Sequence, residues 1–160
     1  MPLITHELVS VLRKQFRLDW RGIHGAPHWA RVRANGLRLA LLTGANPRVV
    51  EYFAFLHDAC REDDHRDPGH GDRASHLVYA LRPHLALDRG ELNDLMEACE
   101  LHSEGHTHSF NTTILTCWDA DRLDLARVGI TPHPSRLCTD AARDPGMIRW
   151  AVDGSLRRPR

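Results

Sequence analysis

The sequence predicts an all-α fold, a helical bundle of about six to seven helices. Apolar residues recur at steps of three and four, capping residues precede these segments, and no segment alternates between apolar and polar residues. The 160 residues fit one domain covering 1–160, because no linker rich in proline, glycine or serine interrupts them. We therefore expect a single bundle rather than two units.

Start and stop signals place the first three helices. The first follows a Thr5 cap, where threonine can accept a hydrogen bond from the first turn. The second runs from about 28 to 43 and ends at Gly44, a residue that tolerates the left-handed backbone. The third begins at Asn46-Pro47, a capping residue followed by proline in the first turn.

The second half of the chain opens with a polar loop at 60–69. Beyond it we expect helices at about 70–82, after an Asp88 cap, through the apolar stripe Ile114–Leu125, and near 145–152. The stretch 130–139, ITPHPSRLCT, contains two prolines and is predicted as a loop. The basic tail 156–160 is expected to fray.

Charge and cysteine usage restrict the partners and the compartment. Lys plus Arg and Asp plus Glu number 21 each, so we expect no nucleic-acid or membrane partner. The four cysteines lie far apart without a CxxC pair, which favours free thiols in a reducing compartment. No basic region followed by an apolar run and a cleavage site opens the chain, so a cytoplasmic protein is expected.

Polar residues extend the apolar stripes of five predicted helices. Val50, Phe53 and Ala54 lead to His57 at the i+3 and i+4 steps that keep residues on one helix face. The same extension on the other four stripes reaches His28, His70, His102 and Asp121. Twelve histidines are present, and these four of them are expected to point inward.

Inward histidines and aspartates favour a metal site. A lone inward histidine is usually a hydrogen-bonded core residue, but a carboxylate on an apolar stripe costs several kcal/mol unless it has a partner. Neutral imidazole and carboxylate converging in a bundle are ligands for zinc, iron, manganese, cobalt or nickel, and magnesium is also admitted. The adjacent pair His57-Asp58 strengthens this interpretation. His24, His106 and His108 fit either a ligand or another role.

Three motifs carry a resemblance to a known family. They are HWARV at 28–32, FAFLHDACR at 53–61 and WDADRLDLARVGI at 118–130. In this order they resemble the HD phosphohydrolase superfamily, over roughly 26–130. The resemblance implies a helical HD domain whose four metal ligands fall on His28, His57, Asp58 and Asp121.

Asp119 competes with Asp121 for the last ligand, because the motif reads Asp-Ala-Asp. Helix phase favours Asp121, which shares a face with Ile114 and Trp118. HGDRAS at 70–75 and LHSEG at 101–105 resemble the additional histidines of HD proteins with two metals. His70 and His102 would then complete a second site, so that one or two divalent ions bind.

The resemblance implies a phosphohydrolase acting on a small phosphoester, such as a nucleotide. A bound divalent ion lowers the pKa of water and polarises a phosphoryl oxygen. Candidates for proton transfer are Glu62, Asp63 and Asp64, which equally fit a solvated acidic loop. Arg61 and Arg122 are the expected phosphate contacts, whereas Arg31 and Arg73 are expected on the surface or beside acidic side chains.

Two rival functions remain open from the sequence. Some HD proteins with six ligands hold two irons and activate oxygen, so a di-iron oxygenase is the first rival. The second rival is a metal-stabilised binding domain without catalysis. No P-loop or GxGxxG motif is present, and the sequence is compatible with a monomer or a homo-oligomer.

Overall fold

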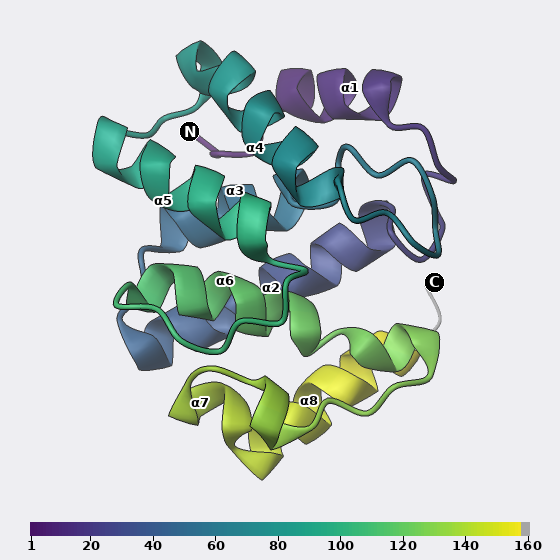
Figure 1. Ribbon diagram of the computed structural model, residues 1–160, viewed down its shortest axis with the longest axis vertical. Coiled ribbons are helices and arrows are strands. Elements are labelled where there is room, and N and C mark those ends of the chain that lie inside the picture. The colour runs from purple at the N-terminus through teal and green to yellow at the C-terminus, as the bar shows by residue number, and fades with distance from the viewer. Residues whose placement is uncertain (158–160) are drawn as a thin grey trace.

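The computed structural model describes residues 1–157 and shows an all-α chain (Figure 1). Eight α-helices and no strand occur within these residues, so the fold class is confirmed and the helix count is one above the expected range. The helices are α1 (His6–Gln15), α2 (Ala26–Thr43), α3 (Pro47–Leu56), α4 (His70–Leu81), α5 (Arg89–Leu101), α6 (Thr112–Arg122), α7 (Asp140–Arg143) and α8 (Pro145–Leu156).

The predicted caps form the helix ends. Side-chain oxygens of Thr5, Asn46 and Asp88 accept backbone N–H bonds in the first turns of α1, α3 and α5. Asp88 also forms a capping box with Glu91, whose side chain accepts from the Asp88 N–H. Gly44 ends α2 in the left-handed region at φ 76°. Local sequence signals therefore set these boundaries.

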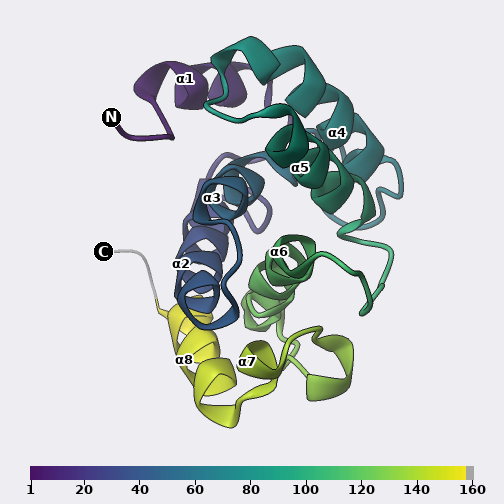
Figure 2. The same cartoon turned by 90° about the vertical axis from the view of Figure 1, so that its left-hand side faces the viewer.

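Two apolar clusters hold the helices together. The larger cluster lies among α1 to α6, with Trp29, Phe53 and Trp118 among its largest buried side chains. In Figure 2, α2 runs beside α3, and α4 pairs with α5, which packs against α3. The smaller cluster, which includes Leu39 and Leu123, packs α7 and α8 against the far end of α2.

The C-terminal third departs from the prediction. The sixth helix ends at Arg122, and Leu125–Val128 form a separate 3-10 turn instead of continuing it. The predicted loop 130–139 contains a 3-10 turn at Pro134–Arg136, and α7 follows it. The last helix continues to Leu156, one residue into the tail that was expected to fray, and 158–160 lie outside the described residues.

Within residues 1–157, no helix combines enough length with enough apolar character to cross a bilayer.

Gly71 allows α4 and α5 to approach each other closely. A Cβ at Gly71 would lie 2.5 Å from the carbonyl oxygen of Glu100 and 2.8 Å from that of Cys99. Backbone atoms cannot move aside as a flexible side chain can. Any larger residue at this position must therefore separate the two helices.

We predict that Gly71→Ala lowers the free energy of unfolding by about 1–3 kcal/mol, because overpacking forces α4 from α5. Urea unfolding followed by circular dichroism measures this change. Gly154→Ala in α8 is the matched control, since nothing lies within 4 Å of its added methyl group. The control should keep or slightly raise stability. Wild-type stability in Gly71→Ala would contradict the proposed role of the close approach.

Candidate metal centre

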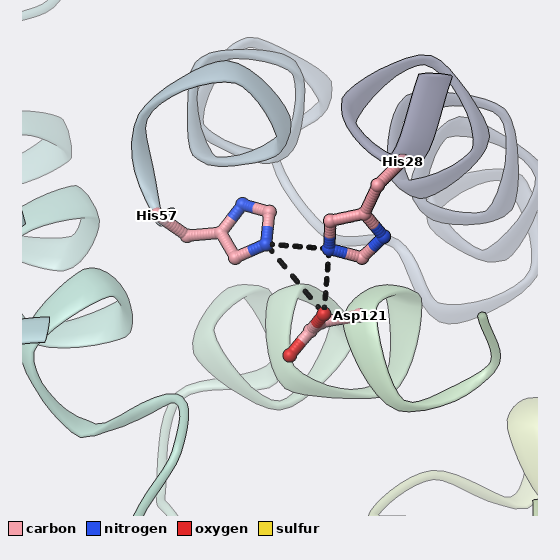
Figure 3. A group of neighbouring side chains, drawn as sticks. All are labelled: His28, His57 and Asp121. Carbon is pink, nitrogen blue, oxygen red and sulfur yellow. Dashed lines mark hydrogen bonds and ion pairs between the residues drawn. The ribbon is translucent and has the colours of Figure 1, made fainter. Parts of the chain in front are cut away.

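Three side chains from three helices meet in the core (Figure 3). His28 comes from the first turn of α2, His57 from the end of α3 and Asp121 from α6. The two Nε2 atoms lie 3.1 Å apart, and Asp121 Oδ1 lies 3.2 Å from His28 Nε2 and 3.5 Å from His57 Nε2. Both histidines are fully buried, and Asp121 retains 19% side-chain exposure. These residues can hold a metal ion.

A second pair of histidines lies beside the first group. His70 opens α4 and His102 caps the end of α5, with their Nε2 atoms 2.9 Å apart. Both histidines are buried. His57, Asp58 and His102 can hold a metal ion of their own.

Asp58 connects the two groups through its two carboxylate oxygens. Oδ2 lies 3.5 Å from His28 Nε2 and 3.6 Å from His57 Nε2. Oδ1 lies 3.3 Å from His70 Nε2 and 3.4 Å from His102 Nε2. The carboxylate therefore faces one histidine pair with each oxygen, the arrangement of a ligand shared between two positions.

Each histidine uses Nδ1 for a protein contact and turns Nε2 inward. Nδ1 of His57 donates to the Phe53 carbonyl at 3.0 Å, and Nδ1 of His102 donates to the Cys99 carbonyl at 2.6 Å. Nδ1 of His70 bonds the Asp67 carbonyl in the same way. Because a carbonyl only accepts, Nδ1 carries the proton and Nε2 is free to bind a cation.

The Nε2 separations fit two ligands on one ion. Nitrogen ligands at about 2.1 Å from a metal, in tetrahedral or octahedral geometry, stand roughly 3.0–3.4 Å apart. The observed separations are 3.1 Å for His28–His57 and 2.9 Å for His70–His102. Facing lone pairs at these distances repel each other unless a cation or a proton lies between them. The chemistry and spacing of the donors therefore suit two ions.

Asp124 orients His28, a role that the sequence did not predict. Its Oδ2 accepts the Nδ1 proton of His28 at 2.7 Å. Its Oδ1 accepts from Arg31 Nε at 2.7 Å and from Ser155 Oγ at 2.6 Å. Asp124 is fully buried and lies one helical turn after Asp121. That spacing was the available signal, but the contact with Ser155 depends on the fold of the C-terminal segment.

The pKa values follow the same contacts. Burial raises the pKa of Asp58, but the surrounding imidazoles outweigh burial and hold it well below its usual range. Asp121 is affected in the same way by His28 and His57. Burial lowers the pKa of His28, whereas Asp121, Asp124 and Asp58 raise it more, to about 9. Negative charge therefore dominates around His28, which favours a positive ion.

A cavity of about 590 Å³ opens onto these groups. Asp58, His70, His102 and Asp121 reach its wall, together with His24, Arg61, Asp64 and Arg127. Arg61 is buried, with its Nε 3.9 Å from Asp58 Oδ1. Its Nε and Nη1 have no hydrogen-bond partner among the described residues. These two nitrogens are shielded from solvent, whereas Nη2 is not, so Nη2 is the end of the guanidinium that can receive an anion from the cavity.

Two of the three predicted proton-transfer residues lie outside this cavity. Glu62 is exposed and accepts from Arg17 Nη1 at 2.8 Å. Asp63 is also exposed, and its carboxylate accepts from the backbone N–H of His65. These contacts match the alternative of a solvated acidic loop. Asp64 alone among the three lines the cavity.

Arg122 also lies away from the cavity, which does not favour its predicted role in binding substrate. Its Nη1 donates to the Arg136 carbonyl at 3.0 Å and to Cys138 Sγ at 3.3 Å, and it lines a different cavity. Arg73 bonds Asp67 and the Cys60 carbonyl, as expected for a partner of an acidic side chain. Of the two predicted phosphate contacts, the structure brings only Arg61 to the site.

Asp119 faces the C-terminal segment instead of the histidines. It is fully buried and accepts from Cys138 N at 2.6 Å, Thr139 N at 2.9 Å and Thr139 Oγ1 at 2.7 Å. The carboxylate thus holds the turn that begins α7. Asp121 occupies the place beside His28 that helix phase indicated.

The three histidines with open roles separate into two locations. His24 lines the cavity beside Asp58 and donates from Nδ1 to Asp64 Oδ1 at 2.8 Å. His106 and His108 line another cavity, beside Phe110 and Trp118. His106 and His108 therefore lie apart from the cavity onto which Asp58 and the inward histidines open.

Comparison of the chain with protein-family models, with curated proteins and with solved structures found no match.

We predict opposite effects for the two neighbouring aspartates. Asp121→Asn should lower bound metal, measured by elemental analysis after dialysis, because it weakens an anionic ligand. Asp119→Asn should keep wild-type metal content but lower stability by about 1–3 kcal/mol, since hydrogen bonds to Cys138 and Thr139 are lost. Loss of metal in Asp119→Asn alone would reverse the assignment.

Proposed function

We propose that this protein is a metal-dependent phosphohydrolase that cleaves a small phosphoester. The observation that carries the proposal is the shared cavity wall. Carboxylates and imidazoles suited to divalent ions, Asp58 and His70 among them, line the same cavity as the guanidinium of Arg61. Cations and arginine together are the usual means of holding and activating a phosphoryl group.

The residues present fit one or two divalent ions. His28, His57, Asp58 and Asp121 would hold the first, and His70 and His102 would add the second, with Asp58 shared. A divalent ion bound here supplies an acidified water and polarises a phosphoryl oxygen. Four neutral imidazoles with three or fewer carboxylate oxygens suit manganese, iron, cobalt, nickel or zinc better than magnesium, which prefers oxygen ligands.

Two arginines support a phosphate on the cavity side of the ligands. Arg61 lies against Asp58, and Arg127 is held by the carbonyls of Ile23 and Asp124. Ile23 and Val128 add apolar wall to the same cavity. We infer a substrate with one anionic group for the ions and arginines and a less polar remainder, such as a nucleotide. The cavity volume suits a small molecule rather than a polymer.

The compartment forms part of the proposal. Cys60, Cys99, Cys117 and Cys138 are all free thiols in the structure. Free thiols, two of them buried, favour a reducing compartment, so we propose a cytoplasmic enzyme.

A di-iron oxygenase is the second candidate function. Its supporting observation is that His70 and His102 join the first four residues to give a set of six, with Asp58 in contact with both histidine pairs. The two functions differ in their co-substrate. Phosphate release under strict exclusion of oxygen supports hydrolysis, whereas oxygen consumption with an oxygen-dependent optical signal supports the oxygenase.

We predict that the purified protein loses phosphoester turnover on chelation and regains it with one of Mn, Co, Ni, Fe, Zn or Mg. His57→Ala and Asp58→Ala should each lose metal and at least about 100-fold of kcat, because they remove ligands shared within the centre. Exposed His76→Ala is the control and should match the wild type. Metal-replete wild-type protein that releases no phosphate across a broad phosphoester panel would refute the hydrolase and leave a metal-stabilised binding domain.

We predict a separate effect for the arginine. Arg61→Gln should keep its metal but lose about 10–100-fold in kcat/KM, because a charged hydrogen bond to substrate is worth about 1.5–3 kcal/mol. Steady-state kinetics with elemental analysis measures both quantities. Unchanged kcat/KM in a metal-replete variant would exclude Arg61 from substrate binding.

A further inference from the structure

A buried histidine paired with a carboxylate lines the cavity beside the ligand residues. His24 retains 9% side-chain exposure and donates from Nδ1 to Asp64 Oδ1 at 2.8 Å. Both side chains reach the cavity wall. Neither belongs to the two groups that can hold a metal. The pair therefore needs an explanation other than metal binding.

The loop before α2 fixes the position of His24 through its backbone. Trp29 Nε1 donates to the His24 carbonyl at 2.8 Å, and Arg127 Nε donates to the Ile23 carbonyl at 2.7 Å. A Cβ at Gly25 would lie only 2.2 Å from the Trp20 carbonyl oxygen, so the loop closes tightly there. Neighbouring carbonyls held from two directions leave this histidine little freedom.

The contact with Asp64 also determines which ring nitrogen is available. A carboxylate only accepts hydrogen bonds, so Nδ1 of His24 carries the proton. Nε2 then has a lone pair and has no hydrogen-bond partner within the described residues. Nε2 is also absent from the unpartnered polar atoms that are shielded from solvent, so it stays accessible from the cavity. This is the geometry by which a carboxylate prepares a histidine for proton transfer.

We propose that His24 is the catalytic proton carrier of this site and that Asp64 is its positioning residue. The inference rests on the proposed phosphohydrolase function and deepens it. His24 is four residues before His28 and its ring stands 6.4 Å from the His28 ring, centre to centre. A phosphoester held at the ions and at Arg61 would thus place its reacting atoms within the cavity that His24 faces.

The proton transfer needs no further reactant. Before the bond to phosphorus forms, Nε2 of His24 takes up the proton that the attacking water loses, since an ion bound at the centre would already acidify that water. The bond from phosphorus to the leaving oxygen breaks, and its electron pair stays on that oxygen. The proton on Nε2 then passes to the leaving oxygen, which departs as an alcohol. His24 ends neutral, with Nδ1 still bonded to Asp64.

Glu62 and Asp63 do not compete for this role, because both are exposed outside the cavity. Asp64 lies on the cavity wall, but one of its oxygens already accepts from His24. His65 also lines the cavity, yet it is exposed, and its backbone is bonded to Asp63. Burial and a fixed partner single out His24.

The leaving group provides the decisive kinetic test. An alkyl phosphate needs a proton on its leaving oxygen, whereas p-nitrophenolate leaves without one. His24→Gln should therefore lose about 100-fold or more of kcat on the alkyl ester and less than about 10-fold on p-nitrophenyl phosphate. Its metal content should equal that of the wild type. Equal losses on the two esters would overturn the proton-carrier role while leaving the hydrolase intact.

The matched control is another histidine–aspartate pair. His76 Nδ1 lies 3.6 Å from Asp72 Oδ2 on the exposed surface of α4. His76→Gln should leave turnover of both esters unchanged. If the metal-replete wild type cleaves neither ester nor any other phosphoester, the proposed function itself fails, and the role of His24 fails with it.

A second measurement does not depend on turnover. Nitrogen-15 NMR of the imidazoles distinguishes the Nδ1–H form from the Nε2–H form. Wild-type His24 should be protonated at Nδ1, and Asp64→Ala should shift it toward the Nε2–H form that predominates without a partner. Nε2–H in the wild type would remove the lone pair that the proposal requires. Asp64→Ala should also reproduce the leaving-group dependence of His24→Gln, with a smaller loss.

Discussion

The arrangement of this protein depends on one buried carboxylate. Asp58 retains 5% side-chain exposure, and isolating such a charge from water costs several kcal/mol. Imidazoles from α2, α3, α4 and α5 surround this carboxylate, and their interaction with it offsets the cost of burying the charge. The four helices must therefore pack so that each brings its histidine to 3.3–3.6 Å from this carboxylate. The close approach of α4 to α5 at Gly71 serves this requirement, because it brings His70 to His102.

The buried atoms that meet between the helices are also the ones that could bind a cation. Nε2 of each inward histidine faces another nitrogen at about 3 Å, so either a proton or a cation must separate each pair. The raised pKa of His28, about 9, shows how strongly the surrounding carboxylates attract positive charge to this point. A divalent ion competes with that proton for the same lone pair. Any ion that binds only the folded chain also stabilises it by mass action.

The sequence predicted the residues that converge in the core better than the residues that support them. His57, His70 and His102 were found by extending apolar stripes, since a helix face is a local property of the chain. The same argument separated Asp121 from Asp119 before any contact was known. Asp124 was not assigned to His28, because that contact joins residues separated by 96 positions and depends on how α6 ends.

The C-terminal segment shows the same limit. The stretch 130–139 contains prolines and no apolar period, so it was predicted as a loop, yet Asp119 organises part of it from inside α6. Arg122 was predicted to contact substrate, but its guanidinium donates hydrogen bonds to Arg136 and Cys138 of this segment. Nothing in the sequence indicated these contacts. A residue next to Asp121 in the sequence can therefore lie far from the cavity, because adjacent positions of a helix point in different directions. Arg61 differs from Arg122 because it follows the end of α3, where the chain bends around the cavity.

The proposed metal ligands and the His24–Asp64 pair come from different kinds of segment, and this difference suits their proposed roles. The proposed ligands stand in helices or directly at their ends, and a backbone carbonyl or Asp124 fixes each imidazole ring. His24 and Asp64 stand on loops: Arg127 holds the first at the Ile23 carbonyl, and Arg73 holds the second at Cys60 and Asp67. Metal ligands would need a rigid frame, and a proton carrier must likewise keep one ring nitrogen turned toward the reacting atoms. Packed helices would meet the first need and anchored loops the second, in one cavity.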